Sequence, residues 1–423
     1  MRSLLFLVIL TAACSPLKKE FQSSEIINDH FVGFALFDPV SNSYLYEYNS
    51  DKYFTPASNT KILTMFASLT YLQDSIIGLK YLETNDTLYF WGTGDPSFLN
   101  PDVHQTGKVY DFLSSTDKIL AFSDLNFYDK YFGPGWGWDD YNDYYSVEKS
   151  AFPIYGNYVV VKNDSASESY FTEPAYFEKF LMVENPDSLK SPVIREVNNN
   201  IIHVNRPDTV ELDKILPFKT SSELTVKLLE DTLNREVVYV QKARPSNTRS
   251  IMSTPIDSLV APMMVYSDNF IAEQLLLNVS EMMSDSLLAE IAIDSIQNYG
   301  FNDLPDKLNW VDGSGLSRYN LFTPRSVVSV WNKLENLIEF DRLKGLLATG
   351  GVNGTIRNLY SAEDAFIWGK TGSLRNNHSL SGFIHTDKGK TLIFSYMNSN
   401  YTLSSSEIKS EMDKVLRIIK SNY

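Results

Sequence analysis

Residues 56–69 read PASNTKILTMFASL, and this stretch decides how the rest of the chain is interpreted. Within it, Ile62 and Phe66 recur at helical spacing, which predicts a buried helix that begins near Ser58. Residues three positions apart lie on one side of a helix, so Lys61 should lie beside Ser58. The unpaired N–H groups of the first turn should point toward the Ser58 hydroxyl. A nucleophile, a base and part of an oxyanion-binding site would then share one turn.

The Ser-x-x-Lys pattern alone is weak, because it is expected about three times by chance in a Ser-rich chain of this length. It occurs elsewhere in the chain, for example at Ser15, Ser115 and Ser406, but Ser15 lies in an N-terminal leader and Ser406 begins a predicted surface helix. Ser58 differs because it opens a buried helix. The alternative that Ser58 only caps this helix, with Lys61 solvated, stays open.

Two rarer motifs follow Ser58-Asn59-Thr60-Lys61 along the chain. They are Ser267-Asp268-Asn269 and Lys370-Thr371-Gly372, and Lys-Thr-Gly occurs once. Together the three motifs supply a hydroxyl nucleophile, an amine base, a second hydroxyl with an amide, and a cation that suits a carboxylate. This combination predicts acyl transfer through a serine.

Strand patterns concentrate near the two ends of the chain. A hairpin precedes the Ser58 helix, three strands lie near the C-terminus, and an amphipathic helix over 408–419 closes the chain. We therefore predict an α/β (α+β) core, in which one five-stranded antiparallel sheet is flanked by helices and the Lys370 strand forms the edge next to the Ser58 helix. The predicted strands are 31–37, 44–48, 365–373, 379–386 and 391–397.

About 200 residues separate Lys61 from Ser267, which is far more than one connection needs. We predict a mixed α/β insertion over 81–243, so that the acyl-transfer domain comprises 26–80 and 244–423. Strands at 88–91 and 158–161 and a helix over 221–233 belong to the insertion. An aromatic cluster over 128–145 fits either a packed loop, which we favour, or a surface that stacks on sugar rings.

Three further blocks, and an extension of the Lys-Thr-Gly motif to residue 374, accompany the three motifs, and together they span nearly the whole chain after the leader. With them the chain resembles D-alanyl-D-alanine carboxypeptidases of the penicillin-binding protein 4 type, peptidase family S13. The most family-specific block is residues 312–318, because other serine acyl enzymes with the same core lack it. The blocks are GTGDP at 92–96, GPGWGWDD at 133–140, DGSGLSR at 312–318 and KTGSL at 370–374.

The resemblance implies a penicillin-binding, transpeptidase-like core and a role for each motif residue. Ser58 would attack the carbonyl of a penultimate D-alanine while Lys61 takes its proton, Ser267 would relay a proton to the leaving amine, and Asn269 would hold the substrate amide. Lys370 and Thr371 would bind the terminal carboxylate, with Gly372 beside them, and the backbone N–H groups of Ser58 and Ser373 would bind the oxyanion. Peptidoglycan stem peptides and β-lactam antibiotics would be the ligands. The Lys370 cation should also lower the pKa of Lys61.

The first residues predict export. Arg2 precedes an apolar stretch over 4–13 that is too short to span a bilayer, and the single cysteine, Cys14, follows it. We predict a lipoprotein-type signal peptide over 1–13, a lipid anchor at Cys14 and a tether over 14–25, which would place a membrane-anchored protein in the periplasm. An ordinary signal peptide cut nearby is the alternative.

Composition narrows the remaining classes. The net charge of −15 argues against nucleic-acid binding and against electrostatic attraction to anionic lipid. The five histidines show no metal-ligand spacing and no phosphate-binding loop follows a strand, so we expect no metal and no cofactor. Two other functions stay open, a β-lactamase or esterase on the same core and a non-catalytic cell-wall binding protein. Neither oligomeric state nor the balance between carboxypeptidase and endopeptidase activity follows from the sequence.

Overall fold

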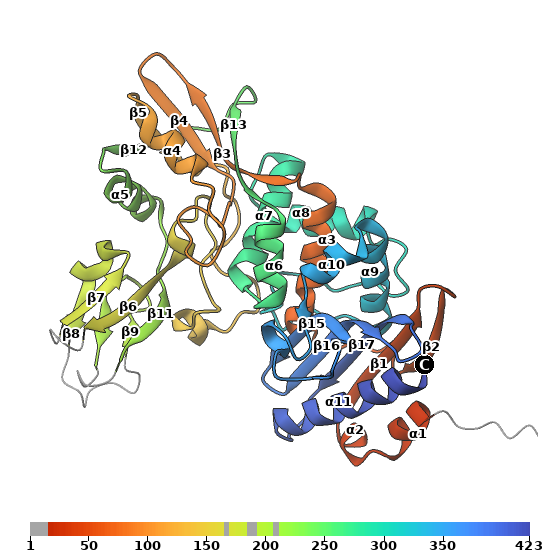
Figure 1. Cartoon of the computed structure of the whole chain (residues 1–423). Helices are drawn as coiled ribbons and strands as arrows, with labels where there is room; N and C mark the ends of the chain where they lie inside the picture. The colour runs from red at the N-terminus through yellow and green to blue at the C-terminus, as the bar shows by residue number, and fades with distance from the viewer. Residues whose placement is uncertain (1–15, 165–168, 184–192, 206–210) are drawn as a thin grey trace, which may run out of the picture.

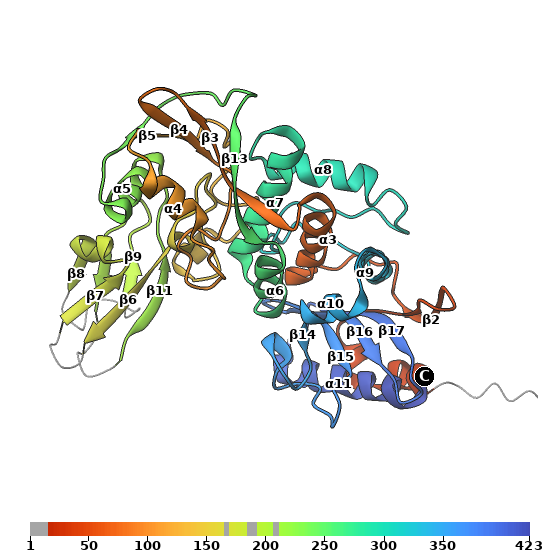
Figure 2. The ribbon, with the colours of Figure 1, turned by 45° about the horizontal axis from the view of Figure 1, so that its top comes forward.

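The computed structural model describes residues 16–164, 169–183, 193–205 and 211–423, and shows two parts joined side by side (Figure 1). The first part is a sheet covered by helices, and both ends of the described chain belong to it. The second part is built from smaller sheets and projects from the helical side of the first (Figure 2). The predicted signal peptide over 1–13 and Cys14 lie outside the described residues.

The core sheet has the strand order β14-β15-β16-β17-β1-β2, and its neighbouring strands are antiparallel. The five predicted strands are all present. The difference is β14, a two-residue strand outside β15, which is too short to carry a detectable hydrophobic period. The strands are β1 (Phe31–Asp38), β2 (Ser43–Tyr48), β14 (Ala348–Thr349), β15 (Ile367–Leu374), β16 (Asn377–His385) and β17 (Thr391–Ser399).

Both faces of this sheet are buried, because alternate side chains of its strands enter two different cores. On β1, Phe34 and Leu36 face the C-terminal helix, whereas Ala35 and Phe37 face the larger group of helices. The first face is covered by α1 (Pro16–Ser23), α2 (Glu25–Asp29) and α11 (Ser405–Asn422). The opposite side holds α3 (Lys61–Tyr71), α6 (Asp257–Val265), α7 (Asn269–Ser284), α8 (Ala289–Tyr299), α9 (Pro324–Leu337) and α10 (Phe340–Gly345).

The prediction of a tether over 14–25 is wrong for its described part. Residues 16–23 form α1, and Leu17 and Phe21 have no exposed surface. The Phe21 ring lies 5.1 Å from each of the rings of Phe34, Tyr46 and Tyr48. In the sequence this segment resembles a linker, because two buried side chains in eight residues give too short a pattern to indicate a packed helix.

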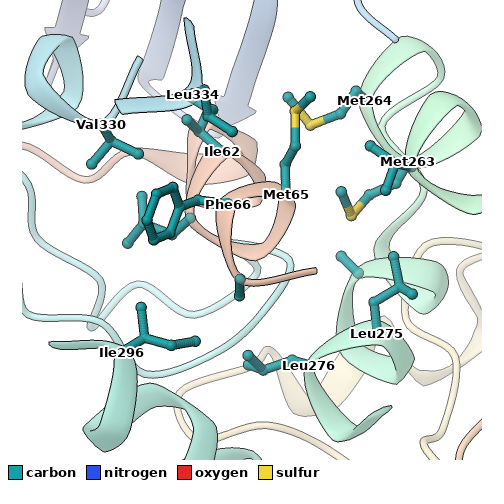
Figure 3. Packing of buried hydrophobic residues seen from close by; sticks show 14 of the residues in the cluster. Ile62, Met65, Phe66, Met263, Met264, Leu275, Leu276, Ile296, Val330 and Leu334 are labelled. Atoms are coloured by element: carbon teal, nitrogen blue, oxygen red, sulfur yellow. The ribbon is translucent and has the colours of Figure 1, made fainter. Parts of the chain in front are cut away.

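Helix α3 is the centre of the helical layer and carries the Ser58 motif at its N-terminal end. Its Ile62, Met65 and Phe66 lie among side chains from α6, α7, α8 and α9 (Figure 3). The sequence predicted that the helix begins near Ser58, but the α-helix begins at Lys61, and Ser58 lies in a 3-10 turn over Ala57–Thr60 that leads into it. Packing on all sides fixes α3, and with it the position of the turn.

The insertion has its own hydrophobic core and a five-stranded sheet of order β12-β5-β4-β3-β13. Strands β3 and β13 pair with each other, so this sheet extends past the predicted boundaries, from Ser75 to Pro255. Two three-stranded sheets complete it. Its elements are β3 (Ser75–Glu83), β4 (Thr87–Gly92), α4 (Lys108–Ser115), β5 (Ile119–Ser123), β6 (Tyr158–Asp164), β7 (Ser169–Glu173), β8 (Leu181–Val183), β9 (Val193–Arg195), β10 (Ile202–Val204), β11 (Asp213–Pro217), α5 (Ser222–Leu233), β12 (Val237–Tyr239) and β13 (Arg249–Pro255).

Candidate active site

Ser58 and Lys61 lie together as the helical spacing predicts. The Lys61 Nζ atom donates to the Ser58 Oγ atom at 3.0 Å, to Asn269 Oδ1 at 2.5 Å and to the carbonyl oxygen of Ser314 at 2.7 Å. Lys61 has no exposed surface, whereas Ser58 is half-buried and faces a cavity. The ammonium group thus has three fixed acceptors, and one of them is the candidate nucleophile.

The Ser-Asp-Asn motif is placed by the start of α7. Asp268 caps this helix by accepting from the backbone N–H of Ile271 at 2.8 Å. Ser267, directly before the cap, has a left-handed backbone (φ 69°) and lines the same cavity as Ser58. Asn269 joins the two parts of the protein, because its Nδ2 atom donates to the carbonyl oxygen of Tyr145 at 2.9 Å while its Oδ1 atom accepts from Lys61.

The block at 312–318 wraps around a buried carboxylate. Asp312 Oδ1 accepts from the backbone N–H of Gly315 at 2.9 Å, and Asp312 Oδ2 accepts from the backbone N–H of Ser317 at 2.7 Å. The indole of Trp136 in the insertion also donates to Asp312 Oδ2, at 3.0 Å. These bonds fix the loop that supplies the Ser314 carbonyl to Lys61, and the bond from Trp136 ties this loop to the block at 133–140.

Strand β15 brings the third motif against the Ser58 turn. A Cβ atom on Gly372 would lie 2.3 Å from the carbonyl oxygen of Pro56, so a glycine is needed for this approach. Asn59 completes the join by donating to the Lys370 carbonyl oxygen at 3.2 Å. Thr371 donates to Thr355 at 2.7 Å, and Ser373 shares a hydrogen bond of 2.7 Å with His378 Nδ1.

The position of Lys370 differs from the one expected for a residue that binds the substrate carboxylate. Its side chain is fully buried and its Nζ atom donates to the carbonyl oxygen of Thr371 at 2.9 Å. Burial, and then the charge of Lys61, lower the pKa of Lys370 well below its usual value. Lys370 therefore tends to lose its own proton in the presence of charged Lys61.

The pKa of Lys61 is lowered to about 8, and the cause is burial. Asp268, Asp312 and Glu273 act in the opposite direction, since their negative charges favour the ammonium form. The repulsion between the two lysines acts on Lys370, whose pKa it lowers further. The effect of Lys370 on the pKa of Lys61 stays a prediction.

Glu273 is a site residue that the sequence analysis missed. It lies four residues after Asn269 on α7, is buried, and accepts from the backbone N–H of Ser314 at 2.7 Å through Oε1. Its Oε2 atom has no hydrogen-bond partner among the described residues. Burial, and then the charge of Asp312, raise the pKa of Glu273 to about 7. The i, i+4 spacing from Asn269 was the available signal.

A cavity of about 1060 Å³ lies between the two parts of the protein. The core contributes Ser58, Ser267, Asn269, Thr371 and Ser373 to its wall. The insertion contributes residues on its other side, among them Asp102, Asp140, Tyr144, Tyr158 and Ile215. Most predicted site residues therefore open on one cavity, whereas Lys61 and Lys370 lie behind its wall.

The aromatic cluster of the insertion is only partly packed. Trp136 lies 6.0 Å from the ring of Phe132 and is anchored by Asp312. In contrast, Tyr128, Trp138 and Tyr144 are exposed by 66%, 81% and 67%. The favoured interpretation, a packed loop, therefore fails for these three side chains, of which Tyr144 lines the cavity.

No group of three or more histidine, cysteine, aspartate or glutamate side chains is placed to hold a metal ion in the described ranges. Among the helices described, none is both long and apolar enough to cross a membrane.

A Ser-x-x-Lys turn packed against a Lys-Thr-Gly strand, under a sheet flanked by helices, is the penicillin-binding, transpeptidase-like architecture of serine hydrolases. The model of the D-Ala-D-Ala carboxypeptidase 3 (S13) family matches residues 15–419, so the chain belongs to this family and is a hydrolase of the serine-type D-Ala-D-Ala carboxypeptidase class. The resemblance seen in the sequence is thereby confirmed.

Individual relatives agree with this assignment. The chain is similar to the D-alanyl-D-alanine carboxypeptidase DacB of Haemophilus influenzae, with 24% identity over 443 residues that cover 93% of this chain and 90% of the relative. It is also 24% identical over 422 residues to a D-alanyl-D-alanine carboxypeptidase of an Actinomadura species, covering 88% of this chain and 78% of that one. The crystal structure of penicillin binding protein 4 from Haemophilus influenzae superposes with a TM-score of 0.76 at 22% identity, covering 96% and 98% of the two chains.

Proposed function

We propose that the chain removes the terminal D-alanine from peptidoglycan stem peptides through an acyl enzyme on Ser58. The observation that carries this proposal is the hydrogen bond of 3.0 Å between Lys61 Nζ and Ser58 Oγ at the wall of the cavity. A neutral Lys61 takes the Ser58 proton as Oγ attacks the carbonyl carbon of the penultimate D-alanine. The pKa of Lys61, lowered to about 8, makes the neutral amine accessible at mild pH.

The tetrahedral intermediate collapses with loss of the C–N bond. In this proposal the backbone N–H groups of Ser58 and Ser373 bind the oxyanion, and Ser267 passes a proton to the leaving amine. Asn269 holds the substrate amide, while Thr371 and Ser373 face the terminal carboxylate from β15. A water molecule then attacks the ester carbonyl and releases Ser58 with its proton restored.

A β-lactam would enter the same sequence of steps, because its strained amide occupies the place of the scissile peptide bond. The solved Haemophilus influenzae neighbour whose structure is described as complexed with a novel β-lactam has a TM-score of 0.68 at 21% identity, covering 95% of this chain and 98% of that one. The same ligand class is proposed for this chain on the basis of Ser58, Lys61 and the shared fold.

The deciding experiment combines product analysis with mass spectrometry. The protein is incubated with a diacyl tripeptide ending in D-Ala-D-Ala, and free D-alanine is quantified. In parallel, benzylpenicillin is added and the adduct is mapped by peptide digestion. Release of D-alanine with a stable adduct on Ser58 supports the proposal. Rapid hydrolysis of benzylpenicillin would indicate a β-lactamase. If neither D-alanine release nor an adduct is detected, the protein is a non-catalytic binding protein.

Export and anchoring form a separate proposal. We infer from the apolar stretch over 4–13 and the single cysteine that Cys14 carries a lipid after signal-peptide removal. The periplasm is the compartment in which a peptidoglycan hydrolase meets its substrate. Expressed in bacterial cells, the Cys14→Ala variant should move from the membrane fraction to the soluble fraction while purified protein keeps its activity. A variant that stays in the membrane fraction would contradict the lipid anchor.

A further inference from the structure

Three side chains that line the cavity are not explained together by the three motifs. Ser373 on β15 lies opposite His378 on β16 in the strand register, and Lys409 reaches the same cavity from α11, which covers this face of the sheet. Ser373 and His378 meet because the tight turn after Leu374 folds β16 back onto β15. Lys409 belongs to the Ser406 copy of Ser-x-x-Lys, which has no catalytic context.

The substrate carboxylate needs a positive partner, and Lys370 is not available for this purpose. Lys370 has no exposed surface and its Nζ atom already donates to the Thr371 carbonyl oxygen at 2.9 Å. Burial also favours the neutral amine, as its lowered pKa indicates. Among the described residues, the cations that line the cavity are Arg318, Arg375 and Lys409, and Lys409 is the one among them that is half-buried.

Lys409 is the best placed of these cations to bind a carboxylate beside Ser373. Its side chain is half-buried and lines the cavity together with Ser373 and His378. Within the part of the chain that the structure describes, its ammonium group forms no hydrogen bond or ion pair. Such a group keeps its donors for a ligand, and a half-buried ammonium is less screened by salt than a fully exposed one.

His378 is a buried imidazole with one satisfied nitrogen. It is 2% exposed, its Nδ1 atom lies 2.7 Å from Ser373 Oγ, and its Nε2 atom has no partner among the described residues. Burial, and then the charge of Lys409, lower the pKa of His378 to about 3. The ring is therefore neutral at physiological pH, so one nitrogen carries a hydrogen and the other a lone pair.

The tautomer of His378 sets the role of the Ser373 hydroxyl. In the tautomer with the hydrogen on Nδ1, the ring donates to Ser373 Oγ, and Nε2, which has no partner among the described residues, carries the lone pair. The carboxylate site proposed below requires this tautomer. The Ser373 hydroxyl, having an acceptor site filled by His378, is left to direct its own hydrogen into the cavity.

We propose that Lys409 and His378 complete a binding site for the terminal carboxylate of the substrate, with Lys409 as its cation and His378 as the residue that positions the Ser373 hydroxyl as a donor. The proposal rests on the function proposed above. It assigns carboxylate recognition to α11 and β16 in addition to the Lys-Thr-Gly strand. His378 is a positioning residue here, because it acts through Ser373, whereas Lys409 contacts the carboxylate directly.

The first experiment tests Lys409 with two matched substrates. An acyl-D-alanine ester of glycolate carries the carboxylate, and the corresponding glycolamide ester replaces it by a neutral carboxamide on the same scissile ester. We expect Lys409→Gln to lower kcat/KM for the glycolate ester by about tenfold or more, mainly by raising KM, because a hydrogen bond between two charged groups is lost. Turnover of the glycolamide ester should be unchanged, which also shows that the variant folds.

Arg375→Gln is the matched control, because Arg375 is an exposed cation that lines the same cavity. A screened, exposed charge is expected to change kcat/KM for the glycolate ester by about threefold at most. Equal losses in Lys409→Gln and Arg375→Gln would overturn the assignment of Lys409, because general attraction of an anion would then be sufficient.

The second experiment tests His378 by a double-mutant cycle with Ser373. His378→Leu should raise KM for the glycolate ester about tenfold, whereas His378→Asn, which keeps an amide donor near the Nδ1 position, should restore most of the loss. In a Ser373→Ala background, His378→Leu should have no further effect. Additive effects, or equal losses on both esters, would mean that His378 only supports the fold.

The outcomes also separate this inference from the proposed function. If the unaltered protein hydrolyses neither ester and forms no acyl enzyme, the proposed function fails. If it is active and the Lys409 and His378 variants keep their preference for the glycolate ester, only the carboxylate site is overturned.

Discussion

The carbonyl oxygen of Ala57 lies directly against Gly315. A Cβ atom on residue 315 would lie 1.9 Å from this oxygen, and Gly315 has a backbone φ of 84°. Ala57, the residue before Ser58, also has a left-handed backbone, with φ 49°. The loop over 312–318 therefore presses on the backbone that positions Ser58, while its Ser314 carbonyl accepts from Lys61.

Replacing Gly315 by alanine should disturb this contact. Because neither the backbone conformation nor the space suits a side chain, we expect Gly315→Ala to lower the free energy of unfolding by about 1–3 kcal/mol. Displacement of Ser58 by a fraction of an ångström or more should slow penicillin acylation by about a hundredfold. Stopped-flow acylation and thermal melting measure the two effects. Gly345→Ala, where a Cβ meets nothing within 4 Å, is the control and should change neither.

Ser58 should be the single site of acylation. Ser58→Ala is expected to abolish covalent labelling by a fluorescent penicillin, whereas Ser115→Ala and Ser406→Ala should label at the rate of the unaltered protein. Both control serines lie on surface helices, at the end of α4 and the start of α11. Their hydroxyls have no buried lysine beside them to act as base. Label recovered in a peptide containing Ser115 or Ser406 would disprove the assignment.

The rate of acylation should fall as the pH drops below about 8. Lys61 acts as a base only when neutral, and burial lowers its pKa from 10.5 to about 8, so protonation removes the active form below that value. The acid limb of a kcat/KM profile, measured with an uncharged ester substrate, reports this titration. A limb near pH 10 would mean that Lys61 is solvated during the reaction.

Glu273→Gln should move this acid limb to lower pH. Glu273 has a pKa of about 7, so it is largely ionised while Lys61 titrates, and its negative charge stabilises the Lys61 ammonium together with Asp268 and Asp312. Glutamine keeps an acceptor for the Ser314 N–H and removes the charge. The measurement is the same pH profile, compared with the unaltered protein. An unchanged limb, or one at higher pH, would exclude Glu273 from the control of Lys61.

Phe21 should be needed for stability although it lies close to the predicted export signal. Because its ring is fully buried among Phe34, Tyr46 and Tyr48, we expect Phe21→Ala to lower the free energy of unfolding by about 3–5 kcal/mol. Urea unfolding of protein that begins at residue 15 tests this. Val40→Ala, at a side chain that is 94% exposed, should be neutral. Equal unfolding curves for all three proteins would restore the tether interpretation.

Local features of the site were predictable from the sequence alone. The distance between Ser58 and Lys61 follows from their spacing of three residues, because the geometry of a helical turn fixes it whatever surrounds the turn. The strands that carry Lys370 and the N-terminal hairpin follow from alternating side chains, which each reveal which face is buried. The family followed from several such motifs in a fixed order.

The protonation of the active-site lysines depends on the tertiary structure. Whether Lys370 presents a cation depends on its complete burial, and the pKa of Lys61 depends on Asp268, Glu273 and Asp312, which come from segments more than 200 residues further along the chain. Lys409 and His378 join the same cavity only because α11 and β16 pack beside β15. Burial and electrostatic interaction act through space and sum over all neighbours, so a linear pattern identifies the reacting groups but not their protonation or their final partners.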